Sequence, residues 1–326
     1  MSYSITEENI DQLDSIWQGT RNSISWQPLF LLPTWLHVWL EVFAPSEKAT
    51  VFVVRDGNDV IGIAPFLIKN GVAGIIGSPN VCDYFDFPVV PGREKDFYKT
   101  LLDGLKERNI KTLDCCVVRP DSTIITSLLP VAKQAGYNPV LEPDEVTLET
   151  ELPATWDAYL ESLDGKQRHE VRRKLRRLSE AGEIGYRFVA DAASVPAFAD
   201  TFLKMFVESR SDKATFLTGQ MNVFFRTLLR RTAEIGLLRA VVLELDSKPL
   251  ATLTAFDYQG TIYLYNSGYD PEASSLSVGI LSKAMLIKDS IENGKMKFDF
   301  LKGGEPYKYF LGGKEIALQK CRINLG

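Results

Sequence analysis

The sequence predicts an α+β protein made of two similar halves, and two observations support this fold class. The first is a run of three strand patterns that occurs once in each half. Turn dipeptides such as Asn70-Gly71 and Gln259-Gly260 separate the patterns, as expected for antiparallel hairpins. The strand patterns cover residues 50–55, 60–68 and 72–77 in the first half and 237–245, 250–258 and 261–266 in the second.

The second observation is that a helical pattern and one further strand follow each run. The helix and strand cover about 95–108 and 111–118 in the first half, and about 279–293 and 296–300 in the second. Asp114 and Asp299 fall at similar places in these two strands. Such a repeat predicts a duplication with mixed, largely antiparallel sheets, and chance recurrence of a common element order is the alternative.

The length of 326 residues favours two domains. We expect an N-terminal domain over 1–150 and a C-terminal domain over 151–326. The segment 141–153 is acidic and contains two prolines, so we interpret it as the crossing between the halves. Two helical regions, about 155–181 and 195–209, follow the crossing.

The composition speaks against several classes of protein. Hydrophobic residues make up 45% of the chain and charged residues 24%, as in ordinary globular proteins. The net charge of −5 speaks against a dedicated nucleic-acid-binding protein. The N-terminus is polar and acidic, unlike a secretory signal, and no uncharged apolar run approaches the 18 residues of a membrane span. We therefore expect a cytoplasmic protein with no transmembrane segment.

Cysteine and histidine are too few and too scattered for a metal site. The four cysteines, at positions 82, 115, 116 and 321, have no CxxC spacing, and we expect them to be reduced thiols. The two histidines, His37 and His169, lie far apart in the sequence. We therefore expect no bound metal and no Ser-His-Asp triad.

The junction between loop and helix at residues 274–279 is a candidate anion site. We expect Ser277 to cap the helix that follows and Gly294 to end it. The unpaired N–H groups of a helix start bind diphosphates, and Gly279 allows phosphate oxygens to approach the backbone closely. An ordinary capped helix with nothing bound is the alternative.

The strand 296–300 ends in a stretch that is rich in reactive side chains. Asp299 and Glu305 are candidate carboxylate bases, and Tyr307 can donate a proton. Lys308 can stabilise developing negative charge or hold a phosphate. A solvated, charged loop without a catalytic role is the alternative.

A dense group of cations lies on one amphipathic helix near residue 170. Val171, Leu175 and Leu178 form its narrow apolar stripe. Three interpretations stay open: a solvated face, a site for a phosphate-bearing ligand, or a contact with a membrane surface or tRNA. The cations are Lys166, Arg168, Arg172, Arg173, Lys174, Arg176 and Arg177.

Short motifs that cover most of the chain occur in the order found in one enzyme family. Those in the second half are Tyr263-Leu264-Tyr265, Gly268-Tyr269-Asp270, Leu276-Ser277-Val278-Gly279, Phe298-Asp299-Phe300 and Gly304-Glu305-Pro306-Tyr307-Lys308. Those before it are Pro33-Thr34-Trp35, Trp39, Phe43, Ile63-Ala64-Pro65-Phe66, Cys82-Asp83-Tyr84-Phe85-Asp86, Arg210, Lys213 and Phe216. The ordered set resembles the GNAT-type acetyltransferases of the CelD/BioF2-like group, which are relatives of the FemAB aminoacyl transferases.

The resemblance implies two tandem GNAT-like domains, with acyl-CoA bound in the second half and the acceptor supported by the first. The implied contacts to the acyl-CoA donor, acetyl-CoA or another, are Tyr265, Asn266, Ser277, Val278, Gly279 and Ile280. The implied acceptor contacts are Asp83, Tyr84, Arg168, Arg172, Arg210 and Asp270. The sequence departs from the family where Val278 replaces a proline and where Tyr309-Phe310 replaces a more basic continuation.

We therefore expect an acyl-CoA-dependent N- or O-acyltransferase. In this hypothesis Asp299, Glu305 or a bound water helps to deprotonate the acceptor. Tyr307 or Lys308 assists the departing thiolate. The acceptor is an amine or hydroxyl on a small molecule or saccharide, such as a precursor of the cell envelope or of a polysaccharide. Two alternatives remain: a FemAB-like transferase that uses aminoacyl-tRNA, and a non-catalytic scaffold protein in polysaccharide assembly.

Overall fold

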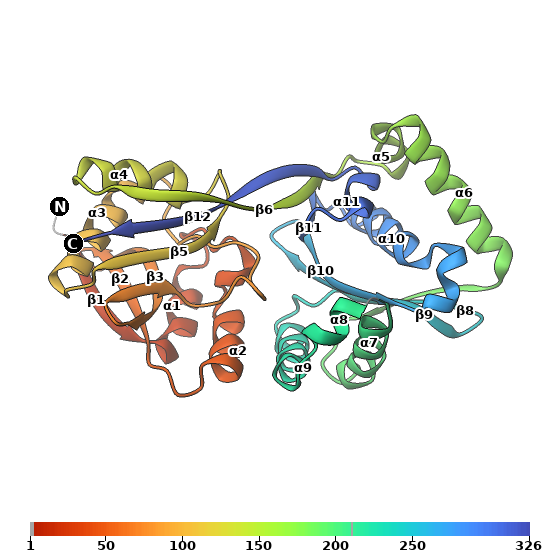
Figure 1. Ribbon diagram of the computed structural model, residues 1–326, viewed down its shortest axis with the longest axis horizontal. Helices are drawn as coiled ribbons and strands as arrows, with labels where there is room; N and C mark the ends of the chain where they lie inside the picture. Colours follow the sequence, from red (N-terminus) through yellow and green to blue (C-terminus); the bar gives the residue numbers. More distant parts are fainter. Residues whose placement is uncertain (1–2, 210) are drawn as a thin grey trace. The chain divides into compact units, whose positions relative to one another are not determined.

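The computed structural model describes residues 3–209 and 211–326. The chain forms two compact units (Figure 1). Unit 1 consists of residues 1–146 and 316–326, and unit 2 of residues 147–315. Each unit contains a sheet with helices packed against it, and the fold class is α+β as predicted.

Unit 1 is built on strands in the order β1-β2-β3-β4-β5-β12. All neighbouring pairs are antiparallel except β4 and β5, which are parallel. The strands are β1 (Tyr3–Asn9), β2 (Ala49–Asp56), β3 (Asp59–Lys69), β4 (Val72–Ile75), β5 (Thr112–Val118) and β12 (Lys314–Asn324). The helices are α1 (Leu13–Thr20), α2 (Pro33–Phe43), α3 (Glu94–Glu107) and α4 (Leu129–Gln134), with short turns η1 (Ile10–Gln12), η2 (Leu29–Leu31) and η3 (Ile124–Leu128).

Unit 2 repeats this arrangement with strands in the order β6-β11-β10-β9-β8-β7. Here β10 and β11 form the parallel pair. The strands are β6 (Pro139–Glu151), β7 (Ile184–Val189), β8 (Ala240–Leu245), β9 (Lys248–Tyr258), β10 (Thr261–Tyr269) and β11 (Lys297–Lys302). The helices are α5 (Trp156–Ser162), α6 (Gly165–Ala181), α7 (Val195–Ser209), α8 (Ser211–Phe216), α9 (Gly219–Glu234), α10 (Val278–Glu292) and α11 (Pro306–Phe310), with the turn η4 (Pro271–Leu276).

The two units share a local detail that supports a duplication. Asp114 on β5 accepts a hydrogen bond from the N–H of Cys116 at 3.0 Å, and Asp299 on β11 accepts one from Leu301 at 2.8 Å. Cys116 and Leu301 both have left-handed backbone, with φ of 54° and 62°. Each carboxylate therefore stabilises a bulge in its own strand, where β5 pairs with β12 and β11 pairs with β6.

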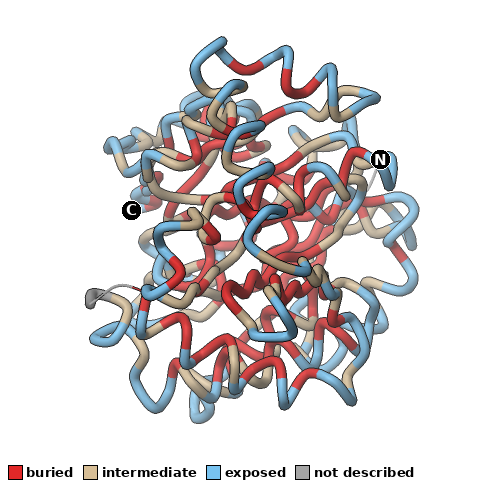
Figure 2. Tube along the Cα trace, turned by 90° about the vertical axis from the view of Figure 1, so that its right-hand side faces the viewer, coloured by how far each residue is buried: buried red, intermediate tan, exposed pale blue. Residues whose placement is uncertain are grey.

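The core of each unit consists of aromatic and aliphatic side chains between sheet and helices. Figure 2 shows buried segments in the interior and exposed segments around them. Unit 1 buries Trp26, Trp35 and Phe52, and unit 2 buries Tyr159 and Phe202. Burial of apolar surface on this scale is the main stabilising contribution in a domain of this size.

The structure differs from the sequence prediction in three places. The helical region 155–181 is two helices, because Asp164 caps α6 in a capping box with Gln167. The crossing segment is the long strand β6, which begins in unit 1 and ends in unit 2. The last strand, β12, pairs with β5 and so belongs to unit 1 rather than to the C-terminal range 151–326. Its apolar residues Cys321 and Ile323 are buried there.

Candidate functional site

The start of α10 has an unusual backbone. Ser277, the residue before the helix, has left-handed φ and ψ of 58° and 31°. Its hydroxyl makes no capping bond to the helix, so the predicted side-chain cap is wrong. The hydroxyl instead accepts a hydrogen bond from the ammonium group of Lys174 on α6 at 2.7 Å. One residue of the basic helix is thus held at the N-terminus of α10.

The first two backbone N–H groups of α10 donate to no backbone acceptor among the described residues. The N–H groups of Ile280 and Leu281 both donate to the Ser277 carbonyl at 3.0 Å. For Val278 and Gly279, no such bond occurs within residues 3–209 and 211–326. Unpaired N–H groups at a helix start carry the partial positive charge of the helix dipole. Two donors and the Lys174 ammonium therefore meet at one place.

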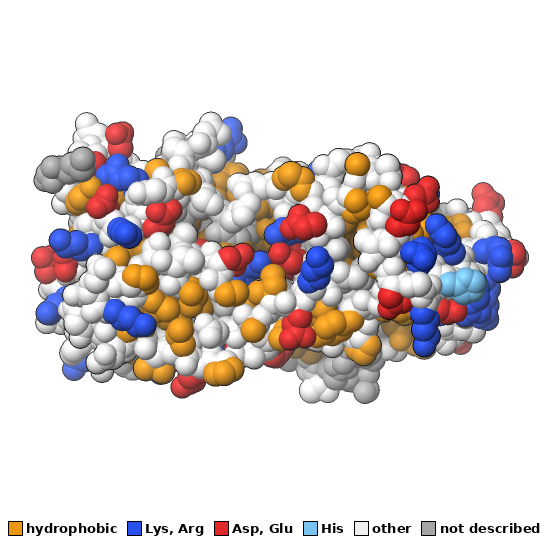
Figure 3. Space-filling view, turned by 90° about the horizontal axis from the view of Figure 1, so that it is seen from above, with side chains coloured by type: hydrophobic (Ala, Val, Ile, Leu, Met, Phe, Trp, Pro, Cys, Tyr) orange, Lys and Arg blue, Asp and Glu red, His pale blue; other side chains and the backbone are white. Residues whose placement is uncertain are grey.

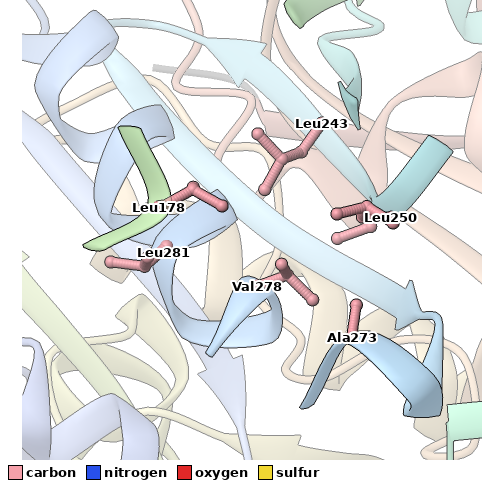
Figure 4. Close-up of a cluster of buried hydrophobic side chains, with 7 residues drawn as sticks. Leu178, Leu243, Leu250, Ala273, Val278 and Leu281 are labelled. Carbon is pink, nitrogen blue, oxygen red and sulfur yellow. The ribbon is translucent and has the colours of Figure 1, made fainter. Parts of the chain in front are cut away.

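A small apolar core fixes this helix start against α6 and the sheet of unit 2. Figure 4 shows Val278 and Leu281 of α10 packed with Leu178 of α6. Val278, which replaces the family's proline, is fully buried in this cluster. The remaining members of the cluster are Leu243, Leu250, Ala251 and Ala273.

The glycines of the neighbouring motifs are required by close packing. A Cβ on Gly268 would lie 2.4 Å from the backbone nitrogen of Phe206 on α7, which leaves no room for a side chain. A Cβ on Gly279 would lie 3.1 Å from the ring of Tyr269. The motif Gly268-Tyr269 therefore brings β10 against α7 and seats the start of α10 on an aromatic ring.

Asp270 follows in the same motif and contacts its own chain. Its carboxylate accepts a hydrogen bond from the N–H of Glu272 at 3.0 Å, which caps the turn η4. It also forms an ion pair with Lys248 at 2.9 Å, and this lysine holds the pKa of Asp270 below its usual range. Both contacts of the Asp270 carboxylate are made within its own chain, and neither requires a bound acceptor substrate.

The parallel strands β10 and β11 separate after a short stretch. They pair over three residues only, from Thr261 to Tyr263 on β10. A register shift between Leu264 and Asn266 on the β9 side makes Tyr265 the bulged residue. Backbone groups of 264–266 thus lie beyond the end of the β10–β11 ladder.

Lys283 is a residue that the sequence reasoning missed. Its side chain is 4% exposed, and its ammonium group donates to the carbonyl of Gly279 at 2.7 Å. The same group lies 4.7 Å from the centre of the Tyr307 ring. Burial lowers the pKa of Lys283 to about 7, since desolvation and repulsion from Lys213 outweigh attraction to Glu305.

The exit from β11 is held by Lys308, which is 2% exposed. Its ammonium group donates to the carbonyls of Leu301 and Lys302 at 2.8 and 2.7 Å. It also lies 2.9 Å from Glu305 Oε2, at ion-pair distance but outside hydrogen-bond geometry. Lys308 therefore ties α11 to the end of β11, while Tyr307 faces Lys283.

The cations of α6 form a surface patch, apart from Lys174. Lys and Arg side chains gather at the right-hand end of Figure 3, where α6 lies in Figure 1. Arg172 is exposed, and Arg168 makes a long contact of 3.5 Å to the Glu161 carbonyl. Arg173 pairs with Glu170 on the same helix at 2.8 Å.

The predicted acceptor residues of the first half lie in unit 1. Tyr84 is 3% exposed and packs in the core, with its ring 5.4 Å from Phe30 and 5.2 Å from the Arg119 guanidinium. Asp83, its neighbour, is half-buried. Arg210 lies outside the described residues.

Two further features of the described residues concern metals and membranes. No group of three or more His, Cys, Asp or Glu side chains in this part of the chain is arranged to hold a metal ion. All four cysteines are free. Among the described helices, none is both long enough and apolar enough for a transmembrane span.

Comparison with known proteins agrees with this geometry. Residues 165–309 match the family model of the acetyltransferase (GNAT) domain. No curated protein matches the chain. The matched range contains α6, the start of α10, the separating strands and the exit from β11.

Solved structures extend the similarity to almost the whole chain. FemX matches with a TM-score of 0.65 at 14% identity, over 97% of this chain and 96% of its own. A conserved protein of unknown function from Bacteroides thetaiotaomicron matches with a TM-score of 0.59 at 12% identity, over 99% and 100%. The C-terminal domain of a putative lysylphosphatidylglycerol synthetase from Agrobacterium fabrum matches with a TM-score of 0.57 at 11% identity, over 89% and 91%.

At these identities the structures establish the fold, and the family model establishes the type of domain. The predicted resemblance to GNAT and FemAB-type proteins is confirmed, as is the prediction of an acyltransferase. Residues 165–309 are a GNAT acetyltransferase domain, carried in an acyltransferase with a GNAT/FemAB-like fold.

Proposed function

We propose that this chain transfers an acyl group from acyl-CoA to an amine or hydroxyl acceptor. The observation that carries the proposal is the start of α10, where the free N–H groups of Val278 and Gly279 meet the Lys174 ammonium. Hydrogen-bond donors with positive charge at a helix N-terminus suit a diphosphate. Because the N–H of Ile280 donates to the Ser277 carbonyl, we assign Ile280 a packing role and no bond to the diphosphate.

The reactive end of the donor would lie along the separating strands. We expect the thioester oxygen to bond to backbone N–H groups at 264–266, next to the bulge at Tyr265. As the acceptor bonds to the acyl carbon, the C–S bond breaks and the acceptor proton passes to Glu305 or to water. The Tyr307 phenol protonates the departing thiolate.

Two of the predicted catalytic residues receive structural roles in this proposal. The Asp299 carboxylate supports the bulge at Leu301, and Asp114 makes the same contact in unit 1. The Lys308 ammonium is engaged by two carbonyls and Glu305. We expect Lys308→Ala to lower turnover only through loss of stability, so turnover per folded molecule tests this assignment.

Calorimetry with CoA and acetyl-CoA tests the donor. The proposal expects binding that weakens about tenfold in a Lys174→Met variant, since one charge-assisted contact is lost. Lys166→Met is the matched control, because Lys166 is an exposed lysine on the same helix. No binding at millimolar CoA would sink the proposal.

A second candidate donor is an aminoacyl-tRNA, with the seven cations of α6 as the observation that favours it. The tRNA backbone would release counterions on binding, so the affinity would fall steeply with salt. Filter binding of tRNA between 50 and 200 mM salt decides between the donors. The leading proposal expects no binding that depends on Arg172 and Arg177.

The acceptor is the least constrained part of the proposal. The resemblance of the whole chain favours an amine or hydroxyl on a saccharide or on a precursor of the cell envelope. Release of free CoA from acetyl-CoA, screened over amino sugars, amino acids and lipid headgroups, would identify the class. If the rate of CoA release is the same with and without each acceptor tested, the chain only hydrolyses acetyl-CoA and transfers no acyl group to these acceptors.

A further inference from the structure

Lys283 occupies an environment that disfavours its charge. The side chain is almost fully buried, and no carboxylate of the described chain lies at ion-pair distance. Side chains on a helix point back toward its N-terminus, and the contact with Gly279 places this ammonium beside the first turn of α10. A cation at that end of a helix opposes the helix dipole.

The charged groups that face Lys283 are mostly cations as well. Lys213 on α8 and Lys308 on α11 both repel its ammonium form, while Glu305 attracts it. Glu305 already pairs with Lys308. On α6, Lys174 brings another positive charge to the same helix start. The one carboxylate near Lys283 is thus already paired with another lysine, and positive groups outnumber it.

We propose that Lys283 is a binding residue for the anionic donor, and that the donor and one proton bind together because the anion supplies the missing negative charge. This inference rests on the proposed function, since it assumes a diphosphate at the first turn of α10. It adds a residue and a proton to that site. In this role Lys283 acts on donor affinity and carries no step of the acyl transfer.

Whether binding takes up or releases a proton follows from the pKa of Lys283 before and after the donor binds. In the free protein, burial holds the pKa of Lys283 at about 7, so the amine is mostly neutral at pH 8. A nearby anion raises the pKa of a lysine by about one to three units, so the bound form is protonated at pH 8. Binding at pH 8 therefore takes up a proton, and binding at pH 6 takes up almost none.

Calorimetry in buffers of different ionisation enthalpy measures this proton directly. The titrant is CoA, at pH 6 and pH 8, in at least three buffers without phosphate. We expect an uptake of more than half a proton per CoA at pH 8 that exceeds the uptake at pH 6. We also expect the CoA affinity to fall about five- to tenfold between these pH values.

Two variants separate Lys283 from the phosphates of CoA and from other groups. Lys283→Met keeps a long flexible side chain without a charge, and it should bind CoA more weakly at pH 6 with no extra proton at pH 8. Lys283→Arg stays charged throughout, so its affinity should be nearly equal at both pH values. Circular dichroism checks that each variant is folded.

The outcomes distinguish this inference from the proposed function. CoA binding with the same proton uptake in wild type and Lys283→Met would overturn the inference and leave the donor site standing. If CoA does not bind at all, the proposed function fails, and inorganic pyrophosphate is the second probe. Pyrophosphate binding with Lys283-dependent uptake would support the inference, and no binding of either probe would overturn it.

Discussion

The equivalent helices α3 of unit 1 and α10 of unit 2 differ in the charge at their N-terminal ends. In unit 1, α3 begins with Glu94 and Asp96 in its first turn, so the helix end receives negative charge from its own sequence. Arg93 before it is held by ion pairs to Asp56 and Asp96 at 2.8 and 3.2 Å. In unit 2, the first turn of α10 contains no acidic residue.

This difference is a physical reason to expect a single donor site in a duplicated fold. The strands β1–β5 and β7–β11 follow the same order, and both units support a bulge with an aspartate. The helix end in unit 1 is neutralised internally. In unit 2, Lys174 and Lys283 bring further positive charge to it, and we expect a bound anion to balance this charge.

The largest expected effect is on stability, from Lys283→Met. The pKa shift from 10.5 to about 7 corresponds to about 5 kcal/mol of unfavourable free energy below pH 7. The unfolded chain binds more protons than the folded chain between pH 7 and 10, so wild-type stability should rise with pH in that range. Urea unfolding should find the variant several kcal/mol more stable at pH 6, with an advantage that shrinks by about half at pH 9.

The second-largest expected effect is the loss of stability when the aspartate at either bulge is removed. Asp299 is 2% exposed, whereas the Asp114 side chain is 26% exposed and also pairs with Arg322. Removal of a buried acceptor leaves an N–H unpaired, so Asp299→Ala should lower the free energy of unfolding by about 3 kcal/mol and Asp114→Ala by about 1 kcal/mol. Unfolding curves measure both. Unchanged stability in Asp299→Ala together with lost turnover would return Asp299 to a catalytic role.

A smaller effect is expected when α10 is given the charge pattern of α3. Ile280→Glu places a carboxylate in the first turn of α10, as Glu94 does in α3. The carboxylate should compete with the diphosphate and weaken CoA binding about tenfold, while stability changes by about 1 kcal/mol or less. Ile280→Gln is the control of similar size. Equal CoA affinity in both variants would argue against an anion site at this turn.

The smallest expected effect on stability and CoA binding comes from the removal of an acidic residue at the start of α3 in unit 1. Glu94→Gln removes one of the charges that balance α3, at a cost of about 0.5 kcal/mol in stability. Because we expect no donor at α3, the CoA affinity and stoichiometry should stay within twofold of the wild-type values. A second CoA per chain in this variant would show that unit 1 retains a latent donor site.

Much of the fold could be predicted from local patterns. Turn dipeptides and period-two strands indicated both meanders, and the repeat offset placed Asp114 and Asp299 at equivalent positions. Glycine and serine at 277–279 indicated the start of α10. The place of β12 in unit 1 could not be predicted, because its pairing with β5 depends on contacts some 200 residues apart.

The site was harder to predict for the same reason. Lys283 looks like a surface lysine in sequence, and only the fold, which places its ammonium over the Tyr307 ring, shows that it is buried. Lys174 is one of seven cations on α6, and only the fold shows that it reaches Ser277. Conversely, Lys308 and Asp299 have reactive side chains, but their backbone contacts become visible only in three dimensions.

A crystal structure of the chain with saturating CoA would show whether the donor binds at the start of α10. We predict one CoA per chain, with its diphosphate bonded to the N–H groups of Val278 and Gly279 and close to Lys174, and none at the start of α3. A diphosphate bound at α3, or a donor bound away from the first turn of α10, would rule out the proposed donor site.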